Sequence, residues 1–81
     1  MSEEIPQELI DTGLDWAWHA PRYYRAVRGT HHATRLDGRW SIAIGAESER
    51  DPIRYAAFAE AVRPTAAEAL AVARRMIEAA Q

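Results

Sequence analysis

The chain has 81 residues, of which 48% are hydrophobic, and a formal net charge of −2, so its length fits a single domain over 1–81. It contains no cysteine, which excludes disulfides, thiolate zinc sites and cysteine nucleophiles. The acidic N-terminus and the lack of a long apolar run are unlike a signal peptide or membrane helix, so we expect a cytoplasmic protein without a membrane partner.

The start of the chain predicts a flexible tail over 1–4 and then a short N-terminal helix. Pro6 fits the first turn of a helix, and Glu8 complements the positive end of its dipole. Gly13 is placed where such a helix would end.

Residues 14–20 are compatible with a strand or a helix. Trp16 and Trp18 alternate with smaller or polar residues as in a strand, whereas the spacing from Ile10 to Trp18 also fits a helix. Pro21 ends the element in either case. On a strand the two tryptophans would share a face, where a packed helix would bury them and an open face would expose them.

The middle of the chain predicts strands over 23–28, 31–36 and 39–44. Asp37-Gly38 lies between the last two, and Asp-Gly favours a two-residue hairpin turn because both turn positions need positive φ. This turn pairs Leu36 with Arg39, Arg35 with Trp40, and Ala33 with Ile42. Trp40, Ile42 and Ile44 then line one core-facing side of the sheet.

A charged loop is expected over 46–52, and residues 53–62 fit a helix or a strand, of which we favour the strand. Thr65 and Glu68 form a capping box, which predicts that a helix begins at about residue 66 and runs to 80. Its apolar stripe comprises Ala69, Leu70, Ala73, Met76 and Ile77. The expected fold class is α+β: a three-stranded antiparallel sheet with a packed C-terminal helix and a short N-terminal helix.

The segment 22–40 is the candidate binding surface. It carries five arginines, one acid and three large aromatics, whereas the first fifteen residues carry five acids and no base. Arginine and aromatic side chains dominate both protein hot spots and stacked nucleic-acid contacts, although a solvated basic face remains open as an alternative. The predicted partner-binding residues are Arg22, Tyr23, Tyr24, Arg25, Arg28, Arg35 and Arg39.

No pattern in the sequence predicts catalysis, a metal or a cofactor. His31 and His32 are adjacent, so on a strand they would point to opposite faces, and His19 is remote from both. No serine lies in a nucleophile elbow, and the glycines form no phosphate-binding loop. We therefore expect a protein that is not an enzyme.

Two further features carry a resemblance. Gly38-Arg39-Trp40 at the start of a strand, and the later run from Pro64 to Leu70, resemble small phage and mobile-element proteins, over residues 31–80. Some proteins of this kind resemble anti-CRISPR inhibitors, which occlude surfaces of a host effector complex. The resemblance implies an inhibitor that docks on a host protein or ribonucleoprotein complex, as a monomer or small homo-oligomer.

The order helix, three strands, helix also resembles a double-stranded RNA-binding domain. That family carries a lysine-rich stretch at the start of its last helix, where this chain has Ala66, Ala67 and Glu68. The alternative function is therefore a small nucleic-acid-binding module that uses segment 22–40, rather than that helix.

Overall fold

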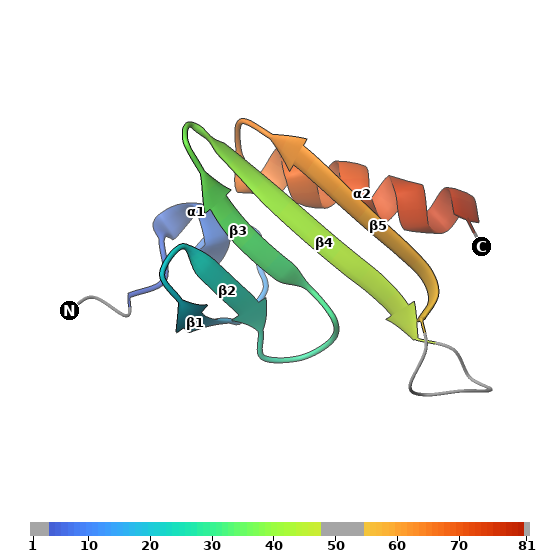
Figure 1. Cartoon of the computed structure of the whole chain (residues 1–81), viewed down its shortest axis with the longest axis horizontal. Helices are drawn as coiled ribbons and strands as arrows, with labels where there is room; N and C mark the ends of the chain where they lie inside the picture. Colours follow the sequence, from blue (N-terminus) through green and yellow to red (C-terminus); the bar gives the residue numbers. More distant parts are fainter. Residues whose placement is uncertain (1–3, 48–54, 81) are drawn as a thin grey trace.

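The protein folds into one antiparallel sheet with helices on one side, as seen in a computed structural model that describes residues 4–47 and 55–80 (Figure 1). The described elements are α1 (Gln7–Ile10), β1 (Trp16–Ala20), β2 (Tyr23–Ala26), β3 (His32–Leu36), β4 (Arg39–Glu47), β5 (Tyr55–Arg63) and α2 (Ala66–Ala80). The strands form a simple meander in the order β1-β2-β3-β4-β5, and every neighbouring pair is antiparallel. This confirms the α+β class and the C-terminal helix.

The sheet has five strands and not the three expected. Within the ambiguous segment 14–20, residues 16–20 form β1, which ends before Pro21 as predicted and pairs with β2. A two-residue turn, Pro21-Arg22, joins β1 to β2 and adds both strands to the hairpin. The sequence patterns favour strands over 23–28, 31–36, 39–44 and 53–62, but how many strands join one sheet depends on contacts across the sheet that no local pattern specifies.

The β3–β4 hairpin has the predicted register. Leu36 pairs with Arg39, Arg35 with Trp40, and Ala33 with Ile42. Gly38 in the turn has a φ of +68°, the conformation that favours Asp-Gly. β4 extends to Glu47, beyond the predicted end at residue 44, and the remainder of the predicted loop at 48–52 lies outside the described residues.

Residues 55–63 form the strand that was favoured over a helix, and α2 follows at once. The Thr65 hydroxyl accepts a hydrogen bond from the Glu68 backbone N–H at 3.2 Å, which is one half of the predicted capping box. α2 packs against β4 and β5 with Ala66, Ala69, Leu70 and Ala73 buried. Met76, expected in the apolar stripe, is instead 46% exposed, since the stripe runs through the alanines.

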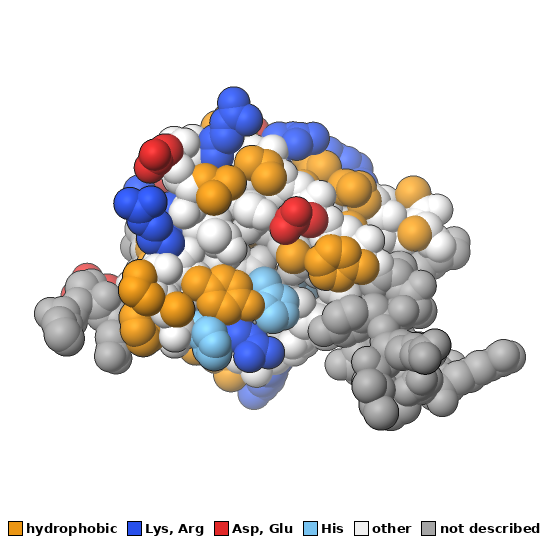
Figure 2. Space-filling view, viewed as in Figure 1, with side chains coloured by type: hydrophobic (Ala, Val, Ile, Leu, Met, Phe, Trp, Pro, Cys, Tyr) orange, Lys and Arg blue, Asp and Glu red, His pale blue; other side chains and the backbone are white. Residues whose placement is uncertain are grey.

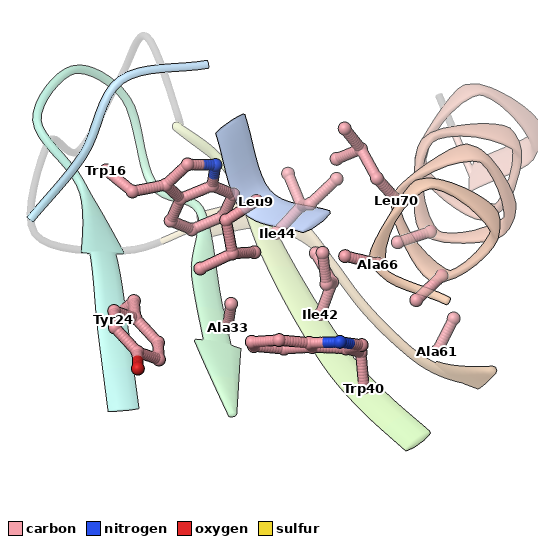
Figure 3. Close-up of a cluster of buried hydrophobic side chains, with 12 residues drawn as sticks. Leu9, Trp16, Tyr24, Ala33, Trp40, Ile42, Ile44, Ala61, Ala66 and Leu70 are labelled. Carbon is pink, nitrogen blue, oxygen red and sulfur yellow. The ribbon is translucent and has the colours of Figure 1, made fainter. Parts of the chain in front are cut away.

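The core lies between this face of the sheet and the two helices (Figure 3). Figure 3 shows Leu9 of α1, Trp16, Ile42 and Leu70 brought together from four elements, and all four are buried. Small side chains such as Ala33 and Ala66 allow close approach of the helices to the sheet. The opposite face of the sheet has no described helix over it, and we call it the open face.

Candidate functional site on the open face

The predicted binding residues do not share one face of the molecule. Tyr23, Arg25 and Arg39 lie on the open face, according to the strand register. Tyr24 points the other way and is only 8% exposed, because its ring packs against Trp40 at a centroid distance of 6.0 Å. Arg35 also lies on the helix-facing side, with its guanidinium 5.4 Å from the centre of the Trp40 ring.

The other two arginines lie in connections between strands. Arg28 is exposed in the segment between β2 and β3. Arg22 is exposed in the β1–β2 turn, where it forms a solvent-accessible ion pair with Asp37 at 3.8 Å. Its φ of +64° is unusual for a residue other than glycine, and asparagine or glycine is the common choice there. Alternation along the strands thus divides the basic segment among both faces and two connections.

The open face contains a groove with a volume of about 270 Å³. This is below the range of about 300–1,000 Å³ typical of pockets that enclose small molecules, so it suits a single side chain. Figure 2 shows hydrophobic and histidine side chains gathered on this face. The groove is lined by Tyr23, His32, Thr34, Ser41, Ala43, Phe58 and Glu60.

Most of the residues that line the groove belong to two rows of directly paired residues. One row runs from Arg25 through His32 and Ala43 to Glu60, and so crosses β2, β3, β4 and β5. The adjacent row runs from Tyr23 through Thr34 and Ser41 to Val62. Small side chains from β3 and β4 therefore form the floor, and larger ones from β2, β3 and β5 form the walls.

The wall on the β2 side is a stacked cluster of aromatic and histidine rings. Tyr23 stacks on His32 at a centroid distance of 5.8 Å and meets the edge of His19 at 5.3 Å. The Tyr23 hydroxyl and Nδ1 of His32 share a hydrogen bond. His19 joins this cluster because the register shifts between Trp18 and Ala20.

The charge state of this wall follows from its surroundings. Burial lowers the pKa of His32 below its ordinary value, and electrostatic interaction with Arg25 and with the His19 ring lowers it further. The imidazole is therefore neutral near pH 7. This leaves Arg25 and Glu60 as the charged groups on the row that crosses the groove.

The opposite wall comes from β5. Phe58 and Glu60 are two residues apart, so both point to the open face. Phe58 is 61% exposed and pairs with Gly45. Neither residue was among the predicted binding residues, although the alternation along 55–62 would have placed them on one face. What the sequence could not indicate was their position across the sheet from Tyr23.

The adjacent histidines His31 and His32 have different surroundings. The pKa of His31 is lowered by burial and by Arg74 of α2, whereas the pKa of His32 is lowered by burial and by Arg25. Within residues 4–47 and 55–80, no group of three histidine or acidic side chains could hold a metal ion. None of the described helices is long and apolar enough to cross a membrane.

Comparison with protein-family models, curated proteins and solved structures finds no match to this chain. The site must therefore be interpreted from its own geometry and chemistry.

Proposed function

We propose that this chain is a non-enzymatic binding protein that docks on a protein surface through the open face of its sheet. The observation that supports this most is the groove, in which Tyr23 and Phe58 rise on opposite sides of a floor of small residues. Large aromatic side chains exposed beside polar groups are typical of residues that dominate binding energy at protein interfaces. Arg25 adds a charged group at the edge of the same surface.

The more specific proposal is that the partner is a host protein or ribonucleoprotein complex whose surface the chain blocks, as anti-CRISPR inhibitors do. The resemblance over residues 31–80 supports this choice of partner. The size of the groove agrees with contact to a side chain of a larger surface, because it is too small to enclose a drug-sized ligand.

The test is a binding and inhibition assay with a purified host effector complex. The wild-type chain should bind stoichiometrically and inhibit the complex, and Phe58→Ser should weaken both effects by about tenfold or more, as expected for loss of a central aromatic contact. Met76→Ser is the matched control, since Met76 is also exposed but lies on α2. Equal loss in both variants, or no binding to any effector complex, would contradict the proposal.

A single-stranded nucleic acid is the second candidate partner. Tyr23 and Phe58 could stack on bases while Arg25 contacts phosphate, which is how many sheet surfaces hold single strands. The carboxylate of Glu60 in the groove disfavours a polyanion, and for this reason a protein partner is preferred. Titration with oligonucleotides at low and moderate salt separates the two, because phosphate contacts by Arg25 and Arg28 would make binding strongly salt-dependent.

A further inference from the structure

The open face of the sheet, which Figure 2 shows, is complementary to itself about a line that runs between β3 and β4, parallel to the strands. One cross-strand row crosses this line from Arg25 through His32 and Ala43 to Glu60. A two-fold axis along the line would place Arg25 over Glu60 of a second copy, and His32 over Ala43. The row would therefore join opposite charges at both ends and set a large ring on a small side chain at its centre.

The row beside it has the same property. It comprises Tyr23, Thr34, Ser41 and Val62, one from each strand from β2 to β5. The same axis would place the Tyr23 ring over Val62 of the second copy, and the two small hydroxyl side chains of β3 and β4 over one another. Side chains of the two copies would therefore interdigitate, as they do between packed sheets.

The charges at the ends of the first row are available for such a contact. Arg25 and Glu60 are both exposed. Within residues 4–47 and 55–80 the ion pair joins Arg22 to Asp37, and neither Arg25 nor Glu60 takes part in it. They lie three strands apart, a separation of about 14 Å at the usual strand spacing. Each can therefore pair with an opposite charge on another molecule.

These charges also favour an axis along the strands over an axis across them. A two-fold axis across the strands would keep β2 over β2 of the second copy, so Arg25 could never lie over Glu60. About the axis along the strands, Arg39, which pairs directly with Leu36, would lie over Leu36 of the second copy. Neither arginine would then lie over a positive charge, and the two arginine–glutamate contacts would be attractive.

We infer that the open face associates with the open face of a second copy of this chain, in a two-fold dimer in which Arg25 of each copy pairs with Glu60 of the other. This goes beyond the proposed function, because the partner is the chain itself. Sheets packed face to face lie about 10 Å apart with their strands within about 30° of one another, a distance that an arginine and a glutamate side chain together can span. Every contact occurs twice, as in other two-fold interfaces.

The size of the face sets the expected strength of the dimer. Strands β2 to β5 cover a width of about 19 Å, and five residues along each strand give a length of about 17 Å. A contact of this extent is smaller than the roughly 800 Å² per partner of a standard stable interface. The expected dimer is therefore weak, with a Kd of about 0.1–1 mM.

Sedimentation equilibrium of the full chain measures the association. The wild-type chain should pass from monomer to dimer over this concentration range. The amide NMR signals that shift on dilution should include those of Thr34, Ser41 and Ala43, and those of α2 should stay unchanged. A chain that remains monomeric at about 2 mM, or dilution shifts centred on α2, would overturn the inference.

Charge reversal identifies the contact. Arg25→Glu and Glu60→Arg should each weaken the dimer by about tenfold or more, because two attractive contacts become two repulsive ones. Both positions are exposed, and circular dichroism checks that each variant keeps its fold. The matched controls Arg28→Glu and Glu78→Arg make the same changes in net charge at exposed positions outside these rows, and should dimerise like the wild type.

Mixing the two variants gives the sharpest test. Arg25→Glu and Glu60→Arg together should form a heterodimer of about wild-type affinity, since both contacts again join opposite charges. Mixed with Glu78→Arg instead, Arg25→Glu should associate more weakly, although the total charge is the same. Single reversals that leave the affinity unchanged, or a mixture that remains monomeric while both variants are folded, would overturn the inference.

The outcomes separate this inference from the proposed function, which uses the same face for a different partner. If the chain dimerises as described but binds no effector complex, the inference stands and the proposed function fails. If the effector complex binds in a Phe58-dependent manner but the chain stays monomeric, the inference fails and the proposed function stands.

Discussion

Arg25 and Glu60 stand at opposite ends of one cross-strand row on the open face, with His32 and Ala43 between them. The row places a positive charge on β2, just beyond the residues that line the groove, and a negative charge on β5 within the groove, although the two residues are 35 positions apart in the sequence. Such a charge gradient selects the orientation of a partner more than it adds affinity.

Reversing the charge of Glu60 should change the affinity of the groove for nucleic acid. Glu60→Arg should improve binding of a single-stranded oligonucleotide by about tenfold at low salt, because it replaces a repulsive group with a phosphate-binding one. Fluorescence anisotropy with a labelled oligonucleotide measures this. Glu78→Arg makes the same change in net charge on α2, so an equal gain there would mean that the location in the groove does not matter.

The histidines predict a pH dependence of stability. The pKa values of His31 and His32 are lowered in the folded protein, first of all by burial, so the folded state resists protonation. Their contribution to stability is complete above the unfolded pKa of about 6.5 and is lost as the pH falls through the lower folded values. Urea unfolding should therefore show a decline between neutral and mildly acidic pH.

A double variant isolates the histidines from the carboxylates. His31→Gln together with His32→Gln should flatten the decline below about pH 6.5, while any loss of stability that begins near the ordinary carboxyl pKa values of about 4 should persist. An unchanged decline in the double variant would assign the pH dependence to other groups.

Two tryptophans on the same face of the sheet should differ in how much their substitution lowers the free energy of unfolding. Trp40 is 2% exposed and Trp18 is 38% exposed. Trp40→Phe should lower the free energy of unfolding by about 1–2 kcal/mol through loss of packing, and Trp18→Phe should change it by no more than about 0.5 kcal/mol. Urea denaturation followed by circular dichroism compares them, and equal losses would be inconsistent with the described core.

The start of α2 predicts a capping contribution. Thr65→Ala should lower the free energy of unfolding by about 1 kcal/mol, because the Glu68 N–H loses its acceptor, and Thr65→Ser should retain most of it. Thermal unfolding of the two variants measures the difference. If serine were as destabilising as alanine, the hydroxyl would not be the stabilising group.

The backbone conformation of Arg22 in the β1–β2 turn predicts which substitutions this position tolerates. Arg22→Asn should leave stability unchanged or slightly raise it, since asparagine adopts a φ of +64° more readily than arginine. Arg22→Val should lower it by about 1–2 kcal/mol, because a branched side chain disfavours this conformation. The asparagine variant thus removes a predicted binding charge without disturbing the fold, and binding assays with it test Arg22 directly.

Much of the fold could be predicted because its signals are local. Asp37-Gly38 fixed the hairpin register, and the pattern from Thr65 to Glu68 marked the start of α2, since turn and cap chemistry involve residues close in sequence. Residues 14–20 stayed ambiguous because the spacing of their apolar residues fits both the alternation of a strand and the periodicity of a helix. Only pairing with β2 decides that they form a strand.

The candidate site was less predictable because it is formed by residues that lie far apart in the sequence and meet only through strand pairing. The composition of segment 22–40 pointed to a binding surface, but alternation along β2 and β3 sends Tyr24 and Arg35 to the helix-facing side and Tyr23 and Arg25 to the open face. Phe58 and Glu60 were overlooked because they lie outside segment 22–40, where arginines and aromatic residues are most concentrated. Their place in the groove depends on β5 pairing with β4.

The order of residues alone determined where turns and helix ends fall, and which side chains along a strand share a face, because backbone geometry and side-chain alternation act over a few residues. The tertiary structure alone decided which face α2 covers and which rings and charges meet across the sheet. Burial of apolar surface drives that choice, and it sums over residues far apart in the chain.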